Sequence, residues 1–76
     1  MDAKYLQRLK QLGVNVRAAR KAKGFTQQDL ATMCGQEKSL IIQRIEKGDF
    51  AGGLFFLYKV ADALGTTASD LLVEPF

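Results

Sequence analysis

The sequence predicts an all-α protein, a single domain built from five helices. Apolar residues recur at spacings of three and four along most of the 76 residues, which is the period of amphipathic helices. A residue that commonly ends a helix follows each of these stretches, namely Gly24, Gly35, Gly48, Gly65 and Pro75. A chain of this length buries only about 60% of its unfolded surface, so it has room for one core.

The first helix is expected to extend to Lys23-Gly24. Gly13 interrupts its pattern, because glycine inside a helix costs about 1 kcal/mol relative to alanine. Two interpretations follow. The helix is continuous, which we favour, or it begins near Leu12 and residues 1–11 form a separate arm or turn. The expected apolar stripe consists of Tyr5, Leu9, Leu12, Val16 and Ala19.

The central stretch, residues 26–48, predicts two short helices joined by a tight turn. Thr26 and Asp29 have the spacing of a capping box, in which each side chain accepts from the other residue's backbone N–H. This pattern starts a helix at Gln27, and Gly35 ends it. The expected buried face consists of Leu30, Ala31 and Cys34.

The second helix of this stretch is expected to begin near Ser39 and to end at Gly48. Its buried face is expected to contain Ile42 and Ile45, which lie three residues apart. A helix, a short turn with glycine and a second helix form the helix-turn-helix geometry, whose second helix enters the major groove of DNA.

Residues 49–53 predict a loop, since two adjacent glycines are poor helix formers. A fourth helix follows, with the stripe Leu54, Leu57, Val60, Ala61 and Leu64. Thr67 and Asp70 repeat the capping-box spacing and start a short last helix that carries Leu71 and Leu72. Phe25, just past the first glycine stop, is expected to fold back onto the core.

The composition excludes several classes of protein. The chain has one cysteine and no histidine, so it offers no Cys/His pair for catalysis and no usual zinc-ligand set. We therefore expect neither an enzyme nor a cofactor, and we expect Cys34 to be a small core residue. No apolar run is long enough to span a bilayer or to serve as the core of a signal peptide, which favours the cytoplasm and no membrane partner.

The net charge of +3 is unevenly distributed. Residues 1–47 hold ten basic and four acidic side chains, a net +6, whereas residues 48–76 hold one basic and four acidic side chains, a net −3. A basic half that contains the helix pair is typical of a protein that binds a polyanion. On charge alone, ordinary solvated helix faces explain the pattern equally well.

With these features in place, the chain resembles the phage repressor and Cro type (XRE-like) helix-turn-helix DNA-binding domains. The resemblance covers Leu12 to Leu72. The residues that carry it are Leu12-Gly13, Val16-Arg17, Arg20, Lys23 to Ala31, Ile42 to Gly48, Leu54, Leu57, Lys59 to Gly65 and Leu71-Leu72. It implies a lambda-repressor-like five-helix bundle over residues 1–76 that binds double-stranded DNA, usually as a dimer.

The chain departs from the family pattern by one additional residue between Gly35 and Ile42. We place it in the turn at residues 36–38, because the match from Ile42 onward has no gap. In this register the base-facing residues implied by the resemblance are Ser39, Leu40, Gln43 and Arg44, with Ile41 beside them. Alternatively, the longer turn rotates the helix and buries either Leu40 or Ile41.

Four further residues are expected to contact DNA phosphates. They are Gln27, which the resemblance implies as an anchor, and the basic residues Arg17, Lys38 and Lys47. Arg20 and Glu46 each lie next to a core position and occupy positions that form an ion pair in the family, so we expect them to bridge the first helix and the DNA-reading helix.

Phe55 and Phe56 cannot both lie on the buried side of the fourth helix, so at least one ring is expected at the surface. A dimer interface is the favoured explanation, to which Leu6, Val73 and Phe76 could add, and an isolated exposed ring is the alternative. The leading functional prediction is a homodimeric repressor. The second is a protein-interaction module, such as an antitoxin-like subunit, that binds a partner protein through exposed apolar residues.

Overall fold

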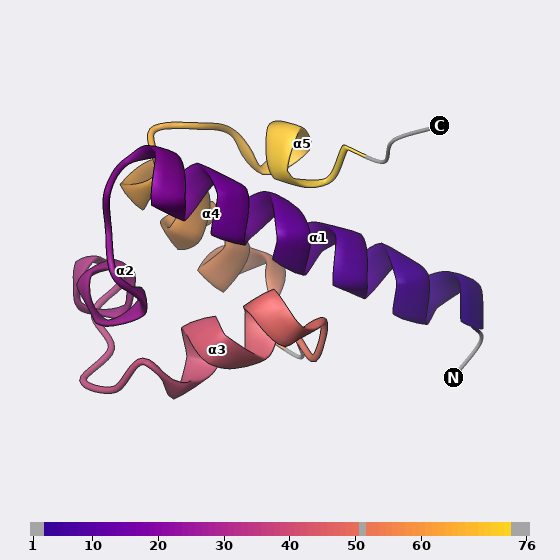
Figure 1. The fold of residues 1–76 in the computed structure, drawn as a ribbon, viewed down its shortest axis with the longest axis horizontal. Coiled ribbons are helices and arrows are strands. Elements are labelled where there is room, and N and C mark those ends of the chain that lie inside the picture. Colours follow the sequence, from indigo (N-terminus) through magenta and orange to yellow (C-terminus); the bar gives the residue numbers. More distant parts are fainter. Residues whose placement is uncertain (1–2, 51, 74–76) are drawn as a thin grey trace.

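The computed structural model describes residues 3–50 and 52–73, and within them it has five helices and no strand. The helices are α1 (Ala3–Ala22), α2 (Gln27–Met33), α3 (Leu40–Lys47), α4 (Leu54–Ala63) and α5 (Ala68–Leu71). Figure 1 shows α1 crossing the length of the molecule, with α3 on one side of it and α5 on the other. The predicted five-helix all-α fold is therefore confirmed.

The helix α1 is continuous through Gly13, so residues 3–11 belong to it and do not form an arm. Gly13 is buried where α1 crosses α3. A Cβ atom at this position would overlap the carbonyl oxygen of Ile45 and would lie 2.9 Å from that of Glu46. The glycine thus allows the two backbones to approach closely, which explains its presence in a helix interior.

One core unites all five helices. It contains all five residues expected from the helix pair, including Cys34, and Phe25 packs against it as expected. Its buried members are Leu12, Val16, Leu30, Ala31, Cys34, Ile42, Ile45, Leu57, Val60, Ala61, Leu64, Ala68 and Leu71.

Two residues of the predicted apolar stripes are exposed. Tyr5 is 54% exposed, because the first turns of α1 extend beyond the rest of the bundle (Figure 1). Leu54 is 59% exposed, since it is the first residue of α4. Helical periodicity identifies the side of a helix, but burial also requires a neighbouring element opposite that side.

The chain after α4 follows the prediction in part. Thr67 Oγ1 accepts a hydrogen bond from Asp70 N at 3.1 Å, but the Asp70 carboxylate accepts from Thr66 Oγ1, so only half of the expected capping box forms. Leu71 is buried, whereas Leu72 lies just past α5 and is exposed. Pro75 and Phe76 lie outside the described residues.

None of the described helices is both long and apolar enough to cross a bilayer.

Candidate nucleic-acid interface

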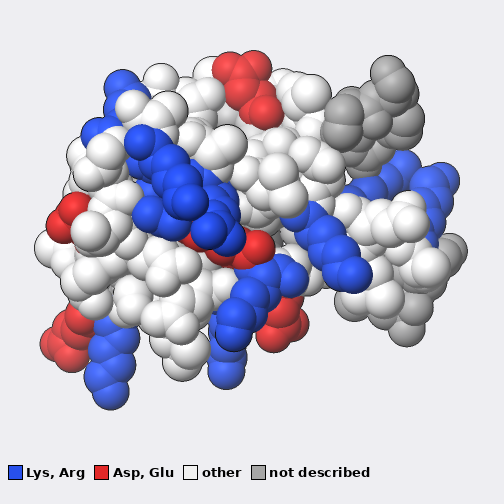
Figure 2. Space-filling model, viewed as in Figure 1, with Lys and Arg blue, Asp and Glu red and all other residues white. Residues whose placement is uncertain are grey.

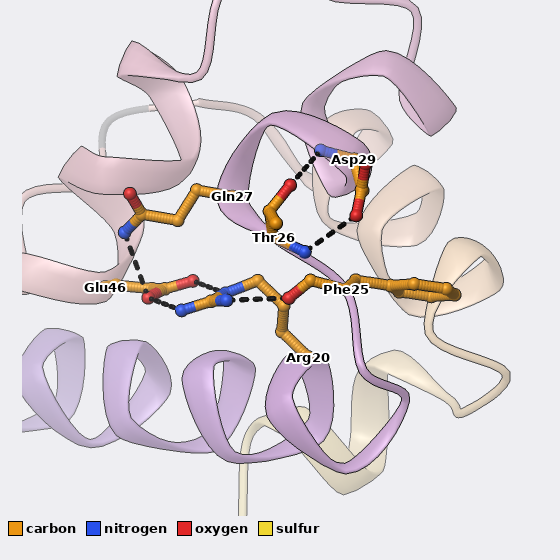
Figure 3. Close-up of polar contacts among 6 residues, drawn as sticks. All are labelled: Arg20, Phe25, Thr26, Gln27, Asp29 and Glu46. Carbon is orange, nitrogen blue, oxygen red and sulfur yellow. Dashed lines mark hydrogen bonds and ion pairs between the residues drawn. The ribbon is translucent and has the colours of Figure 1, made fainter.

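A complete capping box starts α2. Thr26 Oγ1 accepts from Asp29 N at 3.0 Å, and Asp29 Oδ2 accepts from Thr26 N at 2.9 Å (Figure 3). The helix begins at Gln27, as the sequence predicts. These reciprocal bonds satisfy two backbone donors that would otherwise lack partners, so they fix the direction in which the chain enters the helix pair.

The connection between α2 and α3 has the predicted register, but at residues 34–39 it is longer than predicted, because α2 ends at Met33 and α3 begins at Leu40. Gly35 has a φ of +79°, a left-handed conformation that ends α2 at low cost. α3 begins one residue after Ser39, and its fully buried residues are Ile42 and Ile45. The prediction that the additional residue lies in the turn is therefore consistent with the burial pattern.

Arg20 on α1 and Glu46 on α3 form a two-pronged ion pair (Figure 3). Arg20 Nε donates to Glu46 Oε2 at 2.7 Å, and Arg20 Nη2 donates to Oε1 at 3.0 Å. The remaining nitrogen, Nη1, donates to the carbonyl oxygen of Phe25 at 2.8 Å. Because Arg20 is only 8% exposed, these bonds replace its lost hydration and hold α3 at a fixed angle to α1.

The environment of Arg20 keeps its guanidinium charged. The hydrogen bond to Glu46 raises the pKa of Arg20, and the negative charge of Glu46 raises it further, while burial lowers it.

The thiol of Cys34 is buried in the core. Burial raises the pKa of this thiol, and nearby Lys59 partly offsets that shift. Cys34 is thus a buried, protonated core residue, as expected.

Gln27, the expected phosphate anchor, is the first residue of α2 and is half-buried. Its Nε2 donates to Glu46 Oε1 at 3.2 Å, so its side chain extends toward the ion pair (Figure 3). The amide keeps a second N–H, which is available to a partner outside the chain. Gln27 therefore connects α2 to the contact between α1 and α3.

The outward side of α3 carries the residues expected to face bases. Leu40 is 51% exposed and Arg44, one turn later, is also exposed. Gln43 is half-buried and donates from Nε2 to Ser39 Oγ at 2.8 Å. Ile41 packs partly against the core. Of the two apolar residues that sequence alone could not separate, Leu40 is the one at the surface.

The three basic residues expected to contact phosphates are at the surface. Arg17 on α1, Lys38 in the turn and Lys47 at the end of α3 are all exposed. In Figure 2, Lys and Arg side chains spread across the visible face over α1 and along the lower edge, where α3 lies in Figure 1. The positive charge inferred from the sequence is thus close to the helix pair.

The two adjacent phenylalanines of α4 differ in burial. Phe55 is 75% exposed, and the Lys59 ammonium lies 4.9 Å from the centre of its ring. Phe56 is half-buried, packs against the core and lies 6.5 Å from the ring of Phe50, measured between centroids. The prediction that at least one ring is exposed is confirmed for Phe55.

Sequence reasoning missed two side chains that hold this arrangement together. Asn15 Nδ2 donates to the carbonyl oxygens of Leu71 and Val73, each at 2.9 Å, and so ties the end of α5 to α1. Gln28 Nε2 donates to the carbonyl oxygen of Glu37 at 3.0 Å and so holds the longer turn against α2. Neither has a sequence signal, because each partner is a backbone carbonyl that any residue supplies.

These elements define a helix-turn-helix domain, in which α1 supports the pair α2 and α3. The helix-turn-helix family model HTH_3 matches residues 16–71, which is more than half of the chain. The chain belongs to this helix-turn-helix family.

Two solved structures have the same fold. A hypothetical transcription factor from Neisseria, NHTF, superposes with a TM-score of 0.81 and 33% sequence identity, over 88% of this chain and 76% of that one. An HTH_3 family transcriptional regulator from Vibrio cholerae has a TM-score of 0.77 and 21% identity, over 88% of this chain but only 37% of that one. At that identity the second likeness shows the fold alone. A comparison with curated protein sequences gave no match.

Proposed function

We propose that this protein is a sequence-specific DNA-binding regulator of transcription, a homodimeric repressor that inserts α3 into the major groove. The observation that carries the proposal is the outward side of α3. There Leu40 and Arg44 are exposed, while the opposite side is fixed by Ile42, Ile45 and the Glu46 ion pair. A rigidly held helix with exposed side chains of different chemistry is suited to base recognition. The family and the transcription-factor neighbours support DNA binding rather than an enzymatic reaction.

Each outward residue suits a particular group on a base edge. Arg44 can make two hydrogen bonds to guanine, and Gln43 can make two to adenine, each worth about 1 to 3 kcal/mol of discrimination. Leu40 can contact only the methyl group of thymine, and Ser39 can donate to or accept from several bases. Ile41 contributes less, because it packs partly against the core. The reading residues proposed are therefore Ser39, Leu40, Gln43 and Arg44.

Phosphate contacts are assigned to Gln27, Arg17, Lys38 and Lys47. The three basic side chains are exposed near the helix pair, and Gln27 retains an uncommitted amide proton. Phosphate contacts position a protein on DNA and make its affinity depend on salt, because bound counterions are released. We expect the dimer to show a slope of log affinity against log salt steeper than roughly −4.

Selection from a pool of random DNA duplexes tests the proposed function. A regulator of this kind should enrich a palindromic site whose half-sites lie about one helical turn apart, roughly 34 to 36 Å. The binding constant of the selected site should then be measured from low to physiological salt. A pool that shows no enrichment, or an affinity that does not change with salt, would rule out sequence-specific DNA binding.

Dimerisation is assigned to the exposed ring of Phe55, with a smaller contribution from Phe56. An apolar ring this exposed is a common feature of interfaces, and Leu54 and Tyr58 on the same helix are also exposed. Phe55→Ser should give a folded monomer with much weaker operator binding, since Phe55 makes no contribution to the core. A wild-type protein that stays monomeric at high concentration would contradict this assignment.

The same exposed residues on α4 also fit the second candidate, a module that binds a partner protein. Mass measurement of the protein purified from its native cells separates the two. Twice the chain mass supports the homodimer, whereas a complex with a second kind of chain supports the interaction module.

A further inference from the structure

Ser39 occupies the N-cap position of α3 but does not cap the helix. Its φ and ψ are −75° and −4°, in the right-handed helical region, and its side chain makes no capping hydrogen bond. The threonines at the N-caps of α2 and α5 behave differently, since each accepts from a backbone N–H three residues later. Serine at this position usually stabilises the helix it precedes. In α3 the hydroxyl has a different partner.

That partner is the side chain of Gln43, one turn further along α3. Gln43 Nε2 donates to Ser39 Oγ at 2.8 Å, and both residues are half-buried. A primary amide has two N–H donors and one oxygen acceptor, and this bond uses one of the donors. Among the described residues, the side-chain amide of Gln43 takes part in no other hydrogen bond. Its second N–H and its Oε1 therefore remain uncommitted.

These two uncommitted groups match the major-groove edge of adenine, which presents an acceptor at N7 and a donor at N6. A long, flexible side chain loses conformational freedom when it binds, and holding it in place beforehand reduces that loss. We propose that Ser39, one of the reading residues named above, acts on its base through Gln43 and not by a direct contact. In this role it is a positioning residue for Gln43, and the two side chains recognise one adenine as a unit. This inference rests on the proposed function and specifies how one base is read.

The test uses the selected operator and a set of modified operators. In each modified operator one adenine is replaced by 7-deazaadenine, which lacks the N7 acceptor. Gln43→Ala should weaken binding to the normal operator about tenfold, the size of one bidentate base contact, and should remove the preference for one adenine over its 7-deaza form. Ser39→Ala should weaken binding to the normal operator about threefold and weaken binding to that 7-deaza operator by less, because only the contact of Gln43 with N6 remains there. Ser39→Thr, which keeps a hydroxyl, should restore wild-type affinity.

The double variant decides whether the two residues act together. If Ser39 works through Gln43, Ser39→Ala should have no further effect in the Gln43→Ala background. Equal losses in both backgrounds, or a loss shared by every sequence tested, would overturn the proposal, because Ser39 would then contact DNA on its own.

Thermal unfolding separates positioning from a structural role. Ser39→Ala should leave the melting temperature unchanged, whereas Thr26→Ala, which removes a working cap, should lower it. A similar decrease in both variants would overturn the proposal. Failure of this inference can also be told apart from failure of the proposed function. A wild-type protein that enriches no sequence fails as a specific regulator, but one that enriches a site with no adenine sensitive to Gln43→Ala fails only this inference.

Discussion

The inward and outward sides of α3 use the same eight-residue helix for different purposes. On the inward side, Ile42 and Ile45 are fully buried, Glu46 pairs with Arg20, and Gly13 of α1 brings the two backbones together. On the outward side, Leu40 and Arg44 are exposed, and the side chain of Gln43 is hydrogen-bonded to Ser39. Stability therefore depends on the inward side, and the proposed DNA recognition depends on the outward side.

This division predicts that substitutions on the two sides have separable effects. Inward changes should lower the free energy of unfolding and reduce binding to all DNA sequences through loss of folded protein. Outward changes should leave unfolding nearly unchanged and alter the choice of sequence. The four predictions below test this separation, beginning with the largest effect.

Glu46→Ala should destabilise the protein most. The variant leaves the buried guanidinium of Arg20 without its charge partner, and removal of one member of a buried pair typically costs about 3 to 5 kcal/mol. A domain of this size has little stability in excess of that, so the variant should be unfolded or nearly so at room temperature. Urea denaturation followed by circular dichroism measures the change. A stability close to that of the wild type would mean that the ion pair does not hold α3 on α1.

Gly13→Ala should be the next most destabilising change. The new Cβ would overlap backbone oxygens of α3, which cannot rotate away as a side chain can, so the helices must separate. We expect a loss of about 1 to 3 kcal/mol by overpacking, even though alanine is the better helix former. Ala18→Gly, at an exposed position of the same helix, is the control for helix propensity and should cost about 1 kcal/mol. If Gly13→Ala stabilises the protein instead, the close approach of α1 and α3 is wrong.

Arg44→Ala should change recognition without changing stability. Arg44 is exposed, so its loss should alter the free energy of unfolding by less than about 0.5 kcal/mol. Binding to the selected operator should weaken by about 1 to 3 kcal/mol, with much less effect on unrelated DNA. Titrations against the operator and a scrambled duplex measure both values. Equal weakening on the two duplexes would place Arg44 on a phosphate and not on a base.

Much of the fold could be predicted from the sequence because the deciding signals are local. The capping box at Thr26 and Asp29 and the glycine stop at Gly35 act within a few residues of one helix end. The register of α3 could be predicted on a different ground, the ungapped family match from Ile42 onward. The structure agrees with it, since Ile42 and Ile45 share the buried side and Glu46 faces Arg20.

The remaining features depend on what lies opposite a residue, which periodicity does not describe. Tyr5 continues the apolar stripe of α1, yet no element covers the start of that helix. By helix propensity alone Gly13 is a weak point of α1, but a glycine is required there because the backbone of α3 lies so close. Ser39 has the residue type of a cap, but its backbone is already helical and its hydroxyl contacts Gln43. None of these facts is contained in the sequence of a single helix.

Lys47→Ala should have the smallest effect, and it sharpens the comparison because Lys47 follows Glu46 directly. Its side chain is exposed and forms no ion pair among the described residues, so its removal should change the free energy of unfolding by less than about 0.5 kcal/mol. If Lys47 contacts a phosphate, each subunit loses one contact, and the slope of log affinity against log salt should become shallower by about 0.9 per subunit. The preference for the operator over scrambled DNA should stay the same, because a phosphate contact carries no sequence information.

Measurement of the slope for the wild type and the variant on both duplexes checks this. An unchanged slope would remove Lys47 from the DNA interface, while a loss of stability like that of Glu46→Ala would show that the inward and outward sides of α3 are not independent.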